Sequence, residues 1–196
     1  PGGLPDEWRV KACGELALVY AYLQEWRHPA LGEHLPAWRT FIIEHLEDPV
    51  LAQLARKRPA IAFAYLIPYL MLRATGYRSA YYEETLALLR RGNQLRAAEV
   101  VPYRVLEREH ALWKSGWTRD EPRWRLLARA TVLLRCHHPL AWDDEAAYSV
   151  THTLFYLTDF GNRDAHLSLS ELQRAVEFGF APDKSPEQAE AYAREV

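Results

Sequence analysis

Residues 148–161 read Tyr-Ser-Val-Thr-His-Thr-Leu-Phe-Tyr-Leu-Thr-Asp-Phe-Gly, a stretch of helical length that ends at a glycine. At about 100° per residue, Tyr148, His152, Phe155 and Asp159 fall within roughly 60° of one another on one helix face. A second face is apolar, so the pattern predicts a helix that contacts protein on both sides. Polar groups in such a helix need hydrogen-bonding partners or a function. The stretch is therefore the first candidate for a functional site.

Capping residues and prolines divide the rest of the chain into helices. Pro59 opens the most apolar segment, residues 60–72, and Gly76 closes it. This segment is hydrophobic or tyrosine on every side, so it predicts a central, nearly fully buried helix. Pro68 lies inside the segment and is expected to bend that helix.

The pattern as a whole predicts an all-α fold. No alternating strand pattern and no hairpin signal occurs, while helix caps recur at the spacing of helical hairpins. We expect about nine or ten helices, stacked as antiparallel hairpins in an α/α-toroid-like or solenoid-like arrangement. The 196 residues suffice for a single all-helical domain over residues 1–196. Because the sequence opens Pro-Gly-Gly without a methionine, we expect the natural chain to be longer.

Composition excludes several classes of protein. The formal net charge is −2 and no dense run of lysine or arginine occurs, which argues against a nucleic-acid surface. The longest apolar run is too short to cross a membrane, and no signal peptide is expected. Cys13 and Cys136 show no metal-type pairing, so they are predicted to be buried free thiols in a reducing cytoplasm.

His152 and Asp159 are the predicted catalytic pair. They lie two helical turns apart, roughly 10 Å along the axis, so both could contact opposite ends of one ligand. Tyr148 lies one turn before His152, at a spacing that lets the two side chains meet. His152 is the expected proton donor or acceptor, and Asp159 would orient it or bind a polar substrate group. The alternative is a buried hydrogen-bonded network that fixes helix packing.

A helix expected from Pro102 to Gly116 carries a second stripe at the helical period. Its members are Tyr103, Leu106, His110, Trp113 and Trp117. His110 and Trp113, with Phe155, are predicted to shape an aromatic-lined pocket, although core packing would explain the same stripe. Arg104, Glu107 and Arg108 lie off the stripe and are expected to form solvated ion pairs.

No cofactor and no metal site is predicted. Metal-binding side-chain types do gather near one another in the sequence, at His137, His138, His152, Asp159, Asp164 and His166. None of them stands in a recognised metal-binding motif. The chain also has neither a Gly-x-Ser-x-Gly nucleophile elbow nor a phosphate-binding glycine loop.

The pattern Thr-His-x-x-Phe-Tyr-x-Thr-Asp-Phe-Gly, with the upstream Val-Pro-Tyr-Arg-Val-Leu-Glu, resembles an uncharacterised family of all-helical, mostly actinobacterial proteins. The resemblance implies a place in specialised-metabolite biosynthesis. On matching positions it nominates Thr151, His152, Tyr156 and Asp159. The helical hairpins are also similar in architecture to α/α-toroid folds, which house cyclases and transferases.

Two functions follow as expectations. The first is a cytoplasmic protein that binds or converts a small or peptidic metabolite in an aromatic-lined pocket, with His152 as acid or base. An acid/base-type cyclase, isomerase or hydrolase would use such a residue, and the class is left open. The second is a helical-repeat module that presents a groove to a protein or peptide partner without catalysis. Neither function involves nucleic acid or a membrane.

Overall fold

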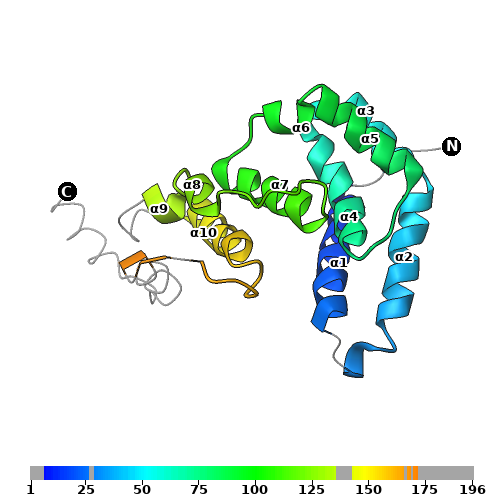
Figure 1. Cartoon of the computed structure of the whole chain (residues 1–196), viewed down its shortest axis with the longest axis horizontal. Coiled ribbons are helices and arrows are strands. Elements are labelled where there is room, and N and C mark those ends of the chain that lie inside the picture. Colours follow the sequence, from blue (N-terminus) through cyan, green and yellow to red (C-terminus); the bar gives the residue numbers. More distant parts are fainter. Residues whose placement is uncertain (1–6, 27–28, 136–142, 166, 169, 172–196) are drawn as a thin grey trace. The chain divides into compact units, whose positions relative to one another are not determined.

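The computed structural model describes residues 7–26, 29–135, 143–165, 167–168 and 170–171. Over these ranges the chain forms ten α-helices and two short 3-10 helices and has no β-strand (Figure 1). This confirms the predicted all-α fold. Contacts divide the chain into two compact units, so the expectation of a single domain stays a prediction. Unit 1 consists of residues 1–100 and 111–121, and unit 2 of residues 101–110 and 122–196.

Unit 1 contains the first six helices in chain order. They are α1 (Glu7–Trp26), α2 (Leu35–Glu47), α3 (Val50–Lys57), α4 (Ala62–Ala74), α5 (Ala80–Arg91) and α6 (Gln94–Ala97), with 3-10 turns at Pro29–Leu31 and Pro59–Ile61. Unit 2 contains α8 (Trp124–Ala128), α9 (Val132–Arg135) and α10 (Asp144–Leu157). Helix α7 (Pro102–Lys114) contributes residues up to His110 to unit 2 and the rest to unit 1.

Helix α4 is the centre of unit 1, as its apolar sequence predicts. Helices α1, α2 and α3 all pack against it (Figure 1). Pro68 lies inside α4 and is itself buried. A Cβ atom at Gly14 of α1 would lie 3.3 Å from the Cγ2 atom of Ile67, so the glycine permits close approach of the two helices. No helix in the described ranges is long and apolar enough to cross a membrane.

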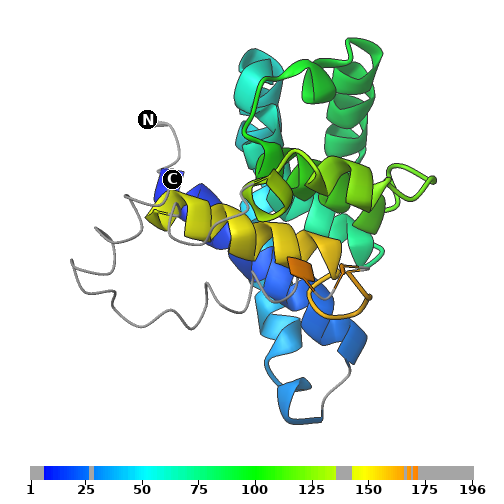
Figure 2. The same ribbon diagram turned by 90° about the vertical axis from the view of Figure 1, so that its left-hand side faces the viewer.

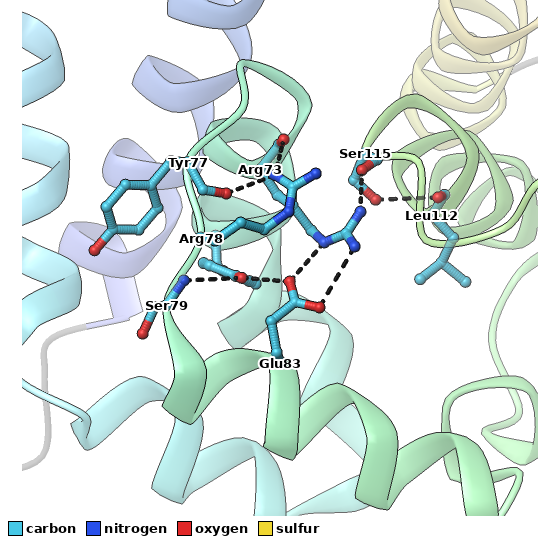
Figure 3. Close-up of polar contacts among 8 residues, drawn as sticks. Arg73, Tyr77, Arg78, Ser79, Glu83, Leu112 and Ser115 are labelled. Carbon is cyan, nitrogen blue, oxygen red and sulfur yellow. Dashed lines mark hydrogen bonds and ion pairs between the residues drawn. The ribbon is translucent and has the colours of Figure 1, made fainter.

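One ion-pair network fixes α4 to neighbouring segments of unit 1 (Figure 3). The Arg73 Nε atom donates to Glu83 Oε1 on α5 at 2.6 Å. The same guanidinium donates to the backbone carbonyl of Ser115, just after α7. The Tyr69 hydroxyl donates to Glu83 Oε1 at 2.5 Å. Burial alone would raise the pKa of Glu83, but the bonds from Arg73 and Tyr69 outweigh burial and lower it.

The cysteine prediction is confirmed for Cys13, which is a buried free thiol on α1. Burial raises the pKa of this thiol to about 11, so the reactive thiolate is scarce at neutral pH. Cys136 lies outside the described residues.

Helix α10 ends earlier than the sequence pattern predicts. Figure 2 shows it in yellow as one unbroken helix, which stops at Leu157, four residues before Gly161. Asp159 and Phe160 then adopt left-handed backbone angles, with φ of 48° and 53°. The expectation that Asp159 continues the helix face of His152 is therefore wrong. A left-handed turn of two non-glycine residues has no periodic signature in a sequence.

Candidate functional site

Unit 2 contains a cavity of about 920 Å³. Its walls come from the start of α7, from the residues around α9, and from the first half of α10. The lining is mostly apolar, with two tyrosine rings and several polar groups. The lining residues are Val101, Pro102, Tyr103, Ala130, Val132, Arg135, Asp143, Asp144, Glu145, Ala146, Tyr148 and Ser149.

The two tyrosines of the cavity both contact the ring of His152. Tyr103 and Tyr148 meet edge to face, with ring centroids 5.7 Å apart. The His152 ring stacks on Tyr148 at 3.7 Å and lies 5.6 Å from Tyr103. The structure thus brings Tyr148 and His152 together, as their spacing predicts, and adds Tyr103 from α7.

Backbone contacts orient the imidazole of His152. Its Nδ1 atom lies 2.8 Å from the carbonyl oxygen of Tyr148. A carbonyl only accepts hydrogen bonds, so Nδ1 carries the proton in this arrangement. The proton-accepting nitrogen of the neutral ring is then Nε2. The Thr151 hydroxyl donates to the Tyr148 carbonyl at 2.9 Å and does not line the cavity.

Asp159 bonds to a different histidine from the one that the sequence suggests. Its Oδ1 atom lies 2.8 Å from the Nε2 atom of His110, and the two residues are 6 % and 1 % exposed. Arg163 donates to the carbonyls of Tyr156 and Leu157 and so caps the end of α10. This capped, left-handed turn holds the Asp159 carboxylate against His110.

Aromatic rings enclose the His110 imidazole. The centroids of Tyr156, Phe160 and Trp124 lie 5.4, 5.8 and 6.1 Å from it. The guanidinium of Arg163 lies 4.3 Å from the centroid of Trp124. His110 does not line the cavity. In this arrangement the His110–Asp159 pair is a buried polar contact between α7 and the turn after α10.

The charged residues of α7 are less solvated than expected, since Arg108 is buried and Glu107 mostly so, while the Arg104 side chain stays 41 % exposed. Arg108 is only 6 % exposed, and its Nε atom lies 3.3 Å from Glu109 Oε1. Glu107 accepts from Arg104 at 2.7 Å and from the Tyr156 hydroxyl at 3.1 Å. Burial, and then the nearby Glu107 carboxylate, raise the pKa of Tyr156. The helical period shows which residues share a face of the helix. It does not show whether another segment packs against that face, so the burial could not be predicted.

A family model described as a domain of unknown function, DUF6895, matches residues 2–178. The chain belongs to the DUF6895 family. The match spans the described residues of the cavity lining, and it agrees with the resemblance to an uncharacterised family. No curated protein and no solved structure matches the chain.

The remaining candidate residues of the DUF6895 chain are not among the residues that line the cavity. Trp113 belongs to the part of α7 in unit 1 and is half-buried. Phe155 is 44 % exposed and stacks on Phe160 at 5.3 Å. Among the described residues, no three histidine, cysteine, aspartate or glutamate side chains converge as metal ligands. His137, His138 and His166 lie outside those residues.

Ser149 is the residue of the site that the sequence pattern did not indicate. It is 7 % exposed and lines the cavity. Within the described part of the chain, no hydrogen bond of its hydroxyl is found, although its carbonyl accepts from Thr153 at 2.7 Å. Ser149, Thr153 and Tyr156 follow the helical period, so a search for buried hydroxyls on one face could have found it.

Proposed function

We propose that this DUF6895 chain binds a small organic or peptidic metabolite in the cavity of unit 2, with His152 as an acid or base. His152 is not itself among the lining residues, but its ring contacts two of them, Tyr103 and Tyr148. The observation that carries the proposal is the cavity itself, in which Tyr103 and Tyr148 form the aromatic wall. Both rings contact His152, so a ligand against that wall would lie close to an imidazole.

The size and chemistry of the cavity support a ligand of modest size. Its volume of about 920 Å³ falls within the range of known ligand pockets, roughly 300–1,000 Å³. Such pockets are mainly apolar and carry a few polar groups that orient the ligand. The lining of this cavity has that composition, since valine, alanine and proline surround a few hydroxyls and charged groups.

The proposal assigns Asp159 a role different from the one expected from sequence. The Asp159 carboxylate bonds to His110 at 2.8 Å, so its proposed role is to position that imidazole. The Tyr148 carbonyl orients the His152 ring instead. The reaction, if the ligand is converted, belongs to the acid/base types of cyclase, isomerase or hydrolase, and a role in specialised metabolism continues the family resemblance. The free thiol of Cys13 is in line with a cytoplasmic protein.

The proposal is tested by a fragment screen on the isotope-labelled protein, followed through backbone amide shifts in NMR spectra. Binding fragments should shift the amides of Tyr103, Val132 and Tyr148 together. Shifts that are scattered over both units, or absent for the whole library, would contradict a ligand site here. The same screen separates this function from the interaction module, which predicts no small-molecule site at this cavity.

The role of His152 is tested with a matched pair of variants. His45 on α2 makes the same local contacts, since its Nδ1 lies 2.9 Å from the Phe41 carbonyl and its ring 4.2 Å from the Phe41 ring. His45 is in unit 1 and does not line the cavity. His152→Ala should abolish conversion of a bound ligand, whereas His45→Ala should leave it unchanged. Equal effects of the two substitutions would show that His152 has only a structural role.

A further inference from the structure

We infer that one end of unit 1 binds an acidic, partly apolar segment of a partner protein. The inference concerns unit 1 alone, so it is independent of the cavity in unit 2 and of the function proposed for it. The surface, here named the basic end, is defined by six cationic residues: Arg56, Lys57, Arg58, Arg90, Arg91 and Arg96.

The fold gathers these cations from separate segments of the chain. Helix α3 ends at Lys57, and the 3-10 turn Pro59–Ile61 follows it closely. That turn packs against α6, and α5, which ends at Arg91, contacts both α3 and α6 (Figure 1). The basic end is therefore a product of the fold, since the sequence itself shows only short runs of two or three cations.

Carboxylates are missing from the segments that form the basic end. Residues 49–82 and residues 85–98 contain no aspartate and no glutamate. Of the two glutamates between these segments, Glu84 pairs with Arg56 at 3.1 Å and Glu83 belongs to the Arg73 network. The remaining cations keep an unbalanced positive charge at the surface, which attracts anions.

Three of the cations are available to such an anion. Lys57, Arg90 and Arg91 are exposed, and none of them forms an ion pair within the described ranges. Helix dipoles explain part of this clustering, because the negative end of a dipole favours cations in the last turn of a helix. Arg90 and Arg91 lie in the last turn of α5, and Lys57 in that of α3.

Two exposed aliphatic side chains beside the cations are not explained by helix dipoles. Ile61 is 47 % exposed and lies three residues after Arg58, while Leu88 is 40 % exposed and lies two residues before Arg90. Protein interfaces combine apolar contacts with arginine, and five of the six cations here are arginines. A guanidinium also binds a carboxylate through two parallel hydrogen bonds. The matching partner is a segment that carries both carboxylates and apolar side chains.

The same side chains favour a protein over other anionic partners. Single-stranded nucleic acids are bound by cations together with aromatic rings that stack on the bases. Ile61 and Leu88 have no ring to offer. Helices that bind membrane surfaces expose a continuous apolar face. These two residues are instead single side chains on separate elements, the 3-10 turn and α5.

The test uses the whole chain and three fluorescein-labelled peptides, with binding followed by fluorescence anisotropy. The first peptide, Glu-Leu-Glu-Asp-Leu-Glu-Glu-Leu-Asp-Glu, carries carboxylates and leucines. The second replaces its acidic residues with Gln and Asn, and should bind at least about ten-fold more weakly. The third replaces leucine with serine, and should bind about three-fold more weakly because apolar contacts are lost. The advantage of the first peptide over the second should fall as the salt concentration rises.

Variants assign the binding to the basic end. The triple substitution Lys57→Gln, Arg90→Gln and Arg91→Gln should weaken binding of the first peptide at least about ten-fold. The matched control removes one lysine and two arginines from exposed positions of α1 and α2. It combines Arg9→Gln, Lys11→Gln and Arg39→Gln, and should weaken binding less than about two-fold.

A double variant tests the aliphatic side chains separately from the charges. Ile61→Ser with Leu88→Ser should weaken the leucine peptide about three-fold and leave the serine peptide unchanged. Both residues are exposed, so the fold should be retained, and circular dichroism melts of all variants check this.

Three outcomes would overturn the inference. Equal losses in the two triple variants would show that only the net charge of the chain matters. Failure of the acidic peptide to bind more tightly than its neutral version would exclude an acidic segment. Tighter binding of a single-stranded oligouridine, or of phosphatidylglycerol vesicles, that the basic-end variant alone abolishes would assign the surface to RNA or to a membrane. None of these results bears on the unit 2 cavity, so the proposed function is tested separately.

Discussion

The polar groups singled out in the two units have different surroundings, a closed network in unit 1 and a cavity in unit 2. In unit 1 the Arg73 guanidinium, the Glu83 carboxylate and the Tyr69 hydroxyl bond to one another, and the Ser115 carbonyl accepts from Arg73 (Figure 3). Every named group in that network has a partner within the unit. In unit 2 the hydroxyl of Ser149 borders a cavity and has no partner in the described part of the chain.

This difference separates polar groups that hold a fold together from those available to a ligand. Satisfied networks specify packing, since each group compensates the desolvation of the next. The Ser149 hydroxyl borders the cavity and is not enclosed, because among the described residues the buried side-chain polar atom without a partner is the Tyr82 hydroxyl of unit 1. Unit 2 contains both kinds, because its His110–Asp159 pair is closed by a hydrogen bond while its cavity is open to a partner.

The largest effect is expected when the closed network of unit 1 is broken. Arg73→Ala removes the cation from a mostly buried pair and should lower the free energy of unfolding by about 3 kcal/mol. Urea denaturation followed by circular dichroism measures the change. The control is Arg90→Ala on an exposed position of α5, where we expect less than about 0.5 kcal/mol. A loss below 1 kcal/mol for Arg73→Ala would show that the network is not a main support of unit 1.

In unit 2, breaking the His110–Asp159 contact should lower the free energy of unfolding by less than Arg73→Ala does. The effects of substituting the two residues should nevertheless be energetically coupled. Asp159→Asn keeps a residue that tolerates positive φ, so it should cost about 1 kcal/mol for the weakened hydrogen bond. Asp159→Ala should cost about 1 kcal/mol more, because alanine is unfavourable at that backbone conformation. A double-mutant cycle with His110→Ala measures the coupling. Additive losses in that cycle would contradict a direct interaction between the two side chains.

The pH dependence of stability distinguishes the unit 1 network from a surface contact. The pKa of Glu83 is lower in the folded chain than its usual value of 4.5. Glu83 therefore stabilises the fold above that value, and the contribution is lost as the pH falls through the folded-state pKa. The difference in unfolding free energy between wild type and Glu83→Gln should shrink as the pH is lowered from 6 to 3. A constant difference over this range would mean that Glu83 has no shifted pKa.

The smallest effect is expected at the open polar group of unit 2. Ser149→Ala removes a hydroxyl that has no hydrogen-bonding partner among the described residues. The free energy of unfolding should therefore stay the same or rise by no more than about 0.5 kcal/mol. Thr153→Ala, one turn further along α10, is the control. Its hydroxyl donates to the Ser149 carbonyl, and the residue is fully buried, so it should lose about 1 kcal/mol. A clear loss on Ser149→Ala would show that the hydroxyl already supports the fold.

The local features of the fold could be predicted from the sequence because they depend on neighbouring residues. The proline and glycine positions predicted the ends of α4 and α7 to within a few residues. The apolar pattern on every side of residues 60–72 predicted a buried helix. The stack of Tyr148 and His152 also follows from their spacing of four residues on one helix.

The parts that failed depend on contacts between distant segments. His110 and Asp159 are 49 residues apart, and only the packing of α7 on the end of α10 brings them together. The left-handed turn at Asp159 ends the helix without a proline, and the glycine signal lies two residues later. Arg108 is buried although its residue type favours solvent. The hydrophobic periodicity of the sequence predicts neither the His110–Asp159 pair, nor the left-handed turn, nor the burial of Arg108.

The division of α7 between the units has a consequence for how the chain could be cut. The backbone passes from one unit to the other after residues 100, 110 and 121, so no single cleavage yields two whole units. A fragment that ends at Val100 would lack the Ser115 carbonyl that accepts from Arg73. A fragment that begins at Pro122 would lack Tyr103, which lines the cavity, and His110, which bonds to Asp159. Both sets of contacts therefore require residues 101–121 in the same chain as the two units.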